Sequence, residues 1–218
     1  MLLGNMRIDF DLRPQIDACL EAARVRQDQA EIGFCLLVSG IVAIWDAYNE
    51  RPYANVKAAE CFQESLAVYE TLGDPFYKAE ALAWVAASTP NEKGRRDQGI
   101  VILRQSFELR REIGDRNGIA WITLGLTEAM ILKLDYPECE RYSREALALM
   151  REIGSVKGAL KAMSKLAVTT IFKGDLDEAR VLVEEMSVLS DETNNLDGKW
   201  MSTGLLACLV PQIAECEG

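Results

Sequence analysis

Histidine is absent from the 218 residues of this chain. Its absence excludes Ser-His-Asp and Cys-His nucleophilic catalysis, histidine-ligated zinc and imidazole acid–base chemistry. No G-x-x-x-x-G-K phosphate loop is present either, since Asp197-Gly198-Lys199 lacks the upstream glycine. Carboxylate pairs such as Glu184/Glu185 point to different sides of a helix and do not converge as an acid–base pair would. We therefore predict no catalytic site, no metal and no cofactor, and a protein that is not an enzyme.

Positive charge and long apolar runs are also scarce. The chain has 24 Lys and Arg against 34 Asp and Glu, a net charge of −10, which argues against direct nucleic-acid binding. No apolar run reaches the ~18 residues needed to cross a membrane, and residues 33–45 come nearest. The amino terminus lacks the pattern of a signal peptide. We expect a cytoplasmic protein that contacts neither membrane nor nucleic acid.

Cysteines form no C-x-x-C pair, and a chain with this much apolar sequence has no need of disulfide staples. Five of the six lie in apolar helical patterns, where a reduced cysteine behaves as a small hydrophobic residue. We expect reduced, buried thiols. The six are Cys19, Cys35, Cys61, Cys139, Cys208 and Cys216.

A repeat of about 40 residues is the strongest positive signal. Three independent series share one frame, and a period near 40 indicates a stack of supersecondary units. The first series is Leu72-Gly73-Asp74, Ile113-Gly114-Asp115 and Ile153-Gly154-Ser155; the second is Gly118, Gly158 and Gly198; the third is Ala58, Gly99, Cys139 and Ala179.

Each unit reads as two helices. Between residues 138 and 153, apolar residues recur every three or four positions while charged residues occupy the other face, and strand alternation is absent throughout. Gly73 and Gly114 are placed to end helices with a positive φ, Asp74 and Asp115 to cap the next ones, and Pro211 to interrupt the last. The predicted helices are about 11–27, 30–47, 54–71, 76–89, 96–112, 118–133, 136–153, 158–173, 176–192 and 198–215.

These helices predict one all-α domain over residues 1–218, a right-handed superhelix of antiparallel helix pairs. It comprises a half repeat at 11–27, repeats at about 28–72, 74–113, 115–153 and 155–192, and a terminal helix at 198–215. An array normally ends in polar capping helices, but the last helix is apolar. We therefore expect the chain to be part of a longer array, or to pair with another copy.

The unit resembles the long, roughly 40-residue form of the tetratricopeptide repeat (TPR), over about residues 28 to 215. The resemblance rests on register: first helices carry a central pair, second helices open with a small residue, and a later position is small except in the fourth repeat. The central pairs are Val85-Ala86, Leu126-Thr127, Leu166-Ala167 and Leu206-Ala207; the later positions are Ser65, Ser106, Ala146 and Met186. The first-helix aromatic of the family is irregular here, and the first pair fits only with an insertion. Similar arrays occur in bacterial signalling ATPases and transcription regulators.

The resemblance implies that first helices line a concave groove, which we expect to bind a partner. Its apolar members could equally pack between adjacent helices, yet two tryptophans and a phenylalanine exceed what a purely polar peptide clamp needs. The predicted site consists of Phe34, Ile41, Trp45, Glu80, Trp121, Leu124, Glu128, Lys161 and Val168.

Lysines at 157, 161 and 165 form one cationic stripe on a helix. The stripe is either a solvated face or an anchor for an acidic peptide or carboxylate.

These observations lead to two candidate functions. The first is a non-catalytic interaction scaffold, a regulatory module of a larger signalling protein, that binds a protein, a peptide or a second copy of the chain in an open trough. The second is an effector sensor of an ATP-dependent transcription regulator, which would hold a small molecule in a closed pocket.

Overall fold

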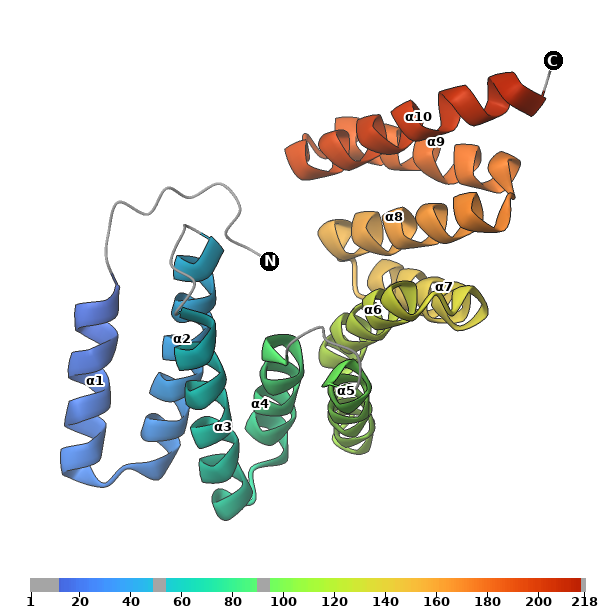
Figure 1. Ribbon diagram of the computed structural model, residues 1–218. Coiled ribbons are helices and arrows are strands. Elements are labelled where there is room, and N and C mark those ends of the chain that lie inside the picture. Colours follow the sequence, from blue (N-terminus) through green and yellow to red (C-terminus); the bar gives the residue numbers. More distant parts are fainter. Residues whose placement is uncertain (1–11, 49–53, 90–94, 217–218) are drawn as a thin grey trace. The chain divides into compact units, whose positions relative to one another are not determined.

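The computed structural model describes residues 12–48, 54–89 and 95–216; the side chains of 45–48, 54–55 and 210–216 lie outside the description. This part of the chain is all-α and contains no strand, as predicted (Figure 1). Its ten helices are α1 (Arg13–Arg26), α2 (Gln29–Tyr48), α3 (Ala54–Leu72), α4 (Pro75–Ser88), α5 (Arg95–Glu112), α6 (Arg116–Lys133), α7 (Tyr136–Glu152), α8 (Val156–Lys173), α9 (Leu176–Glu192) and α10 (Leu196–Cys216).

The turns between helices form for the reasons that the sequence suggests. Gly73 and Gly114 have φ angles of 67° and 71°, a region that costs glycine little and other residues more. The Asp74 carboxylate then accepts a hydrogen bond from the Tyr77 backbone N–H at 3.0 Å, and Asp115 caps α6 in the same way through Gly118. A glycine followed by a capping aspartate therefore ends one helix and starts the next.

The described residues divide into two compact units, one up to Ser106 and one from Phe107, with the division inside α5. The prediction of a single domain over residues 1–218 stays a prediction. In the first unit consecutive helices from α1 to α4 pack against one another, and in the second unit consecutive helices from α6 to α10 do the same, so that successive helices within each run lie antiparallel.

In the first unit, second helices approach first helices closely at the small positions. The Ser65 hydroxyl of α3 donates to the Gly33 carbonyl of α2 at 2.8 Å, and Ser106 of α5 donates to the Ala79 carbonyl of α4 at 2.7 Å. A Cβ on Gly33 would lie 2.9 Å from the Tyr69 ring. Small residues at these positions are thus required by the approach of the two backbones.

In the second unit, the core is formed where α6, α7, α8, α9 and α10 meet. Cys139, Ala146, Ala179 and Met186, which the repeat register assigns to small or apolar positions, have no exposed surface. The Cys139 thiol lies 2.8 Å from the Thr169 hydroxyl of α8, so α7 touches the following first helix as well as its own.

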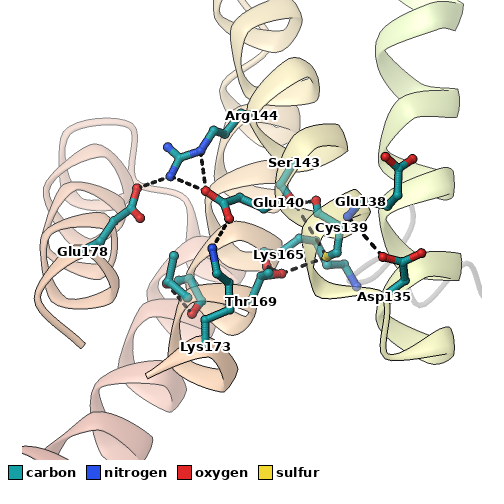
Figure 2. A network of polar contacts seen from close by, with 12 residues as sticks. Asp135, Glu138, Cys139, Glu140, Ser143, Arg144, Lys165, Thr169, Lys173 and Glu178 are labelled. Atoms are coloured by element: carbon teal, nitrogen blue, oxygen red, sulfur yellow. Dashed lines mark hydrogen bonds and ion pairs between the residues drawn. The ribbon is translucent and has the colours of Figure 1, made fainter. Parts of the chain in front are cut away.

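A polar network holds α7, α8 and α9 together at their surface (Figure 2). Glu140 of α7 pairs with Lys173 of α8 and with Arg144 one turn along its own helix, and Arg144 reaches Glu178 of α9 at 2.7 Å. Hydrogen bonds lower the pKa of the Glu140 carboxyl; the bond from Lys173 has the larger effect and the bond from Arg144 the smaller.

Two expectations need correction. Helix α10 runs past Pro211 to Cys216, since a proline removes one hydrogen bond of a helix without always ending it. Cys35, Cys61 and Cys139 are buried free thiols, but Cys19 and Cys208, also free, are exposed. The two exposed thiols lie on α1 and α10, the first and last helices described. Cys216 lies outside the described side chains.

Candidate functional site

Four residues of the predicted site belong to the first unit. Phe34 of α2 is about half exposed and meets the Tyr77 ring edge to face at 6.2 Å, whereas Ile41 packs partly buried against the core. Glu80 of α4 is half-buried and accepts a hydrogen bond from the Trp84 indole N–H at 3.1 Å. The side chain of Trp45 lies outside the described residues. Phe34 is the member of this group that presents most surface to a partner.

The other five residues belong to the second unit, where the structure brings a cation and an aromatic ring together. The Lys161 ammonium of α8 lies over the Trp121 ring of α6, 5.6 Å from its centroid. The two residues are 40 positions apart, so they occupy the same place in successive first helices. Stacking of the repeats therefore creates this cation–π contact.

Lysines one turn away on either side of Lys161 are held by acids on the neighbouring first helices. Lys165 lies 3.7 Å from the Glu128 carboxylate of α6, and Lys157 lies 4.0 Å from Asp197 of α10. We call this surface the lysine face, and it consists of Trp121, Glu128, Lys157, Lys161, Lys165 and Asp197. It carries the predicted Glu128 and Lys161 together with the stripe of three lysines.

Electrostatics make Lys161 the centre of the lysine face. Helix α8 has four lysines and no carboxylate, although the chain as a whole is strongly acidic. Partial burial is the main reason that the pKa of Lys161 is lowered, and the adjacent charge of Lys157 lowers it further. Among the described residues no carboxylate lies within ion-pair distance of its ammonium. A carboxylate from outside would relieve this positive charge.

Two of the predicted residues contribute less surface. Leu124 is only 7% exposed and belongs to the core of the second unit, and Val168 is half-buried. Hydrophobic periodicity could not separate them from exposed members, because both lie at positions that first helices use for packing.

Trp200 of α10 was not predicted, although it is 82% exposed and the most exposed aromatic side chain described. The 40-residue repeat could have drawn attention to it, because this tryptophan stands where the two preceding first helices have Leu160 and Ala120. Both of those residues are buried.

An open cavity of about 500 Å³ is lined mainly by the second helices α5 and α7. Arg141 stacks on the Tyr142 ring at 4.0 Å beside it, and the guanidinium of Arg111 lies 5.9 Å from the Phe107 ring. Both arginines already pair with glutamates, Arg141 with Glu138 and Arg111 with Glu108. The lining residues are Phe107, Glu108, Arg111, Ile119, Arg141, Tyr142, Glu145 and Leu149.

Among the described residues, no group of histidine, cysteine, aspartate or glutamate side chains is arranged to hold a metal ion. No described helix is both long enough and apolar enough to pass through a bilayer.

Antiparallel helix pairs that recur every 40 residues, with small residues where the two helices meet, define a helical-repeat solenoid of the TPR type. No family model matches the chain, and no curated protein matches its sequence. Solved structures do match, and they contain TPR arrays.

One similar structure is a STAND (signal transduction ATPase with numerous domains) protein with a tetratricopeptide repeat sensor from Pyrococcus horikoshii. It is 18% identical with a TM-score of 0.71, over 90% of this chain and 30% of that protein. Another is a Rap protein complexed with Competence and Sporulation Factor, 14% identical with a TM-score of 0.69, over 90% of this chain and 58% of the other. The chain thus spans less than two thirds of either protein.

A third similar structure contains nearly identical TPR-like repeats of the kinesin light chain type from Podosopora anserina. It is 13% identical with a TM-score of 0.52, over 84% of this chain and 98% of the other. At these identities the likeness establishes the fold.

Proposed function

We propose that this chain is a non-catalytic protein-interaction module, and that the lysine face binds a carboxylate-bearing segment of a protein or peptide partner. The observation that carries the proposal is Lys161: a partly buried ammonium, flanked by two further lysines, that rests on the Trp121 ring. Trp121 supplies apolar area for the partner, at about 25 cal/mol per Å² removed from water. The lysines set orientation and association rate more than affinity.

Further support comes from the solved neighbours. The Rap structure holds Competence and Sporulation Factor, and the archaeal STAND protein carries its TPR array as a sensor. By analogy we assign this chain a regulatory role within a signalling protein. We also place it in the cytoplasm, in keeping with five free cysteines among the described residues.

Selection of a random peptide library on the immobilised protein tests the proposal. We expect enrichment of peptides that combine Asp or Glu with an aromatic residue. The Lys161→Glu variant should then bind the selected peptides at least tenfold more weakly. Arg180→Glu is the matched control, since it makes the same charge change at an exposed position of α9.

The Arg180→Glu control should bind as the parent does, and both variants should melt within a few degrees of it. Equal loss of binding in the two variants would show that net charge, and not the lysine face, attracts the peptides.

A small-molecule effector is the second candidate, and the 500 Å³ cavity lined mainly by α5 and α7 is the observation that favours it. An effector bound there would be insensitive to Lys161→Glu. Changing Arg111 to Glu should abolish its binding, because that change reverses the charge at the cavity.

A further inference from the structure

The repeat register identifies two positions that face each other in every complete helix pair. Second helices align on the residue of positive φ that follows them, which places Cys19 of α1 at the position of Ser65, Ser106, Ala146 and Met186. First helices align on their capping residue, which places Trp200 of α10 at the position of Gly33, Ala79, Ala120 and Leu160.

Contacts in the structure show that these two positions meet. Ser65 donates to the carbonyl of Gly33, and Ser106 donates to the carbonyl of Ala79, so the same pair of positions touches in two successive repeats. In all four complete pairs both positions are buried. The pair is bulkiest in α8 and α9, where Leu160 takes one position and Met186 the other.

In helix α10 the first-helix position of this contact is exposed. Trp200 is 82% exposed, while Leu160 is 1% exposed at the equivalent place in α8. Thr203 and Ala207, on the same side of α10, are exposed as well, whereas their counterparts are buried in both other first helices of the unit. Those counterparts are Met163 and Ala167 in α8 and Thr123 and Thr127 in α6.

In helix α1 the second-helix position of the same contact is exposed. Cys19 is exposed, although its four counterparts have no exposed surface. Leu20 and Ala23, on the adjoining side of α1, are buried against α2, just as α3, α7 and α9 pack against the first helix that follows them. Among the described residues, α1 therefore contacts the first helix that follows it and no first helix of its own repeat, and α10 is a first helix whose second-helix side is not covered.

We propose that α1 of a second copy of this chain docks on α10, with Cys19 of that copy against Trp200, and completes one repeat. The contact continues an interface that the chain already makes four times, because α1 and α2 would follow α10 in the order in which second and first helices alternate. A large tryptophan facing a small cysteine fills space much as Leu160 and Met186 do. Association is head to tail, since each copy offers one α10 face and one α1 face.

Charge supports this occupant. Helix α9, which packs beside α10 and would lie next to the incoming α1, carries six carboxylates and one arginine. Helix α1 carries three arginines and two carboxylates. In a chain of net charge −10, α1 has one more basic than acidic residue, which suits it to an acidic end of the array.

Sedimentation velocity over a range of protein concentrations tests the proposal on the full chain. We expect the parent to grow with concentration beyond a dimer. Trp200→Asp in α10 and Cys19→Arg in α1 should each weaken self-association at least tenfold. Val188→Asp is the matched control, because Val188 is an exposed apolar residue of α9 whose counterparts Ala148 and Glu108 are also exposed; it should associate as the parent does.

A mixture of the two end variants gives the sharper result. Trp200→Asp retains its α1 face and Cys19→Arg retains its α10 face, so the mixture should form a one-to-one dimer and nothing larger. All three substitutions are at exposed positions, and unchanged circular dichroism and melting show that the variants are folded.

A parent that stays monomeric at all concentrations overturns the proposal, and leaves α10 open to a helix from a different protein. Self-association of Cys19→Arg alone to the parent's extent also overturns it, because α10 would then pair with α10. A loss with Val188→Asp equal to that with Trp200→Asp would assign the association to apolar surface in general.

Discussion

Lys161 shows how one residue can be unfavourable for stability and suited to function. Burial and neighbouring lysines lower the pKa of its ammonium, so the folded state disfavours the charge that the unfolded chain carries freely. Because the folded pKa is lower than the unfolded one, the cost is fully present below the folded pKa and is relieved as pH rises through it. Residues of this kind are retained at binding sites more readily than in a core.

Replacing Lys161 by Met should therefore preserve or raise the stability of the protein, by up to about 1 kcal/mol, while it abolishes the binding of acidic peptides. Methionine retains the contact with Trp121 and removes the charge. Thermal melting of the Lys161→Met variant checks the expected stability, and peptide binding by the same variant checks the expected loss of affinity. A loss of stability with unchanged binding would make Lys161 a structural residue.

Cys139 and Ala179 occupy the small position near the start of the second helices α7 and α9, and both are fully buried. Phenylalanine at either position should destabilise the protein by about 1–3 kcal/mol through overpacking. Ala148→Phe, at an exposed position of α7, should stay within about 0.5 kcal/mol. Urea denaturation of the three variants measures these changes in the free energy of unfolding. Equal denaturation midpoints would mean that the register assigned to α7 and α9 is wrong.

Among elements, the positions of α7, α8 and α9 depend on a polar network as well as on apolar packing. Glu140 connects to Lys173 of α8 and, through Arg144, to Glu178 of α9 (Figure 2). From the sequence such charges are expected to form a solvated face, since the periodicity of one helix does not reveal partners on other helices. The structure shows that this face is shared by three helices.

This network predicts a pH dependence. The folded pKa of Glu140 lies below its unfolded value of about 4.3, so its contribution is fully present above that value and is lost as pH falls through the folded pKa. Glu140→Gln should lower stability at pH 7 by about 1 kcal/mol or less, because its partners are partly exposed. The difference from the parent should shrink toward pH 3. A difference that stays constant with pH would assign the loss to packing.

At the scale of the molecule, an acidic chain concentrates positive charge in a few helices. Helix α8 has four lysines and no acid, while α9 beside it has six carboxylates. The lysine face and the acidic end of the array are therefore distinct surfaces suited to different partners: a carboxylate-bearing segment for one and the basic α1 of another copy for the other.

The sequence by itself determined the helices, their turns and the class of fold. Ten helices were placed to within about two residues of their ends, because glycine at a positive φ, a capping side chain and apolar periodicity are local properties of the chain. The 40-residue series added the pairing of helices, since repeated small residues such as Ala146 mark where backbones approach. Lys161 and Trp121 also fell within the predicted site, as their register in first helices is a sequence property.

Exposure was decided by tertiary structure. The same position of a first helix is a buried Leu160 in α8 and an exposed Trp200 in α10. Likewise, one position of the second helices is a buried Met186 in α9 and an exposed Cys19 in α1. Leu124 was expected at a binding surface and lies in the core. Periodicity shows which residues share a face of a helix, but only the arrangement of helices shows whether another helix covers that face. That difference separates the core from the two surfaces at which this chain is proposed to bind.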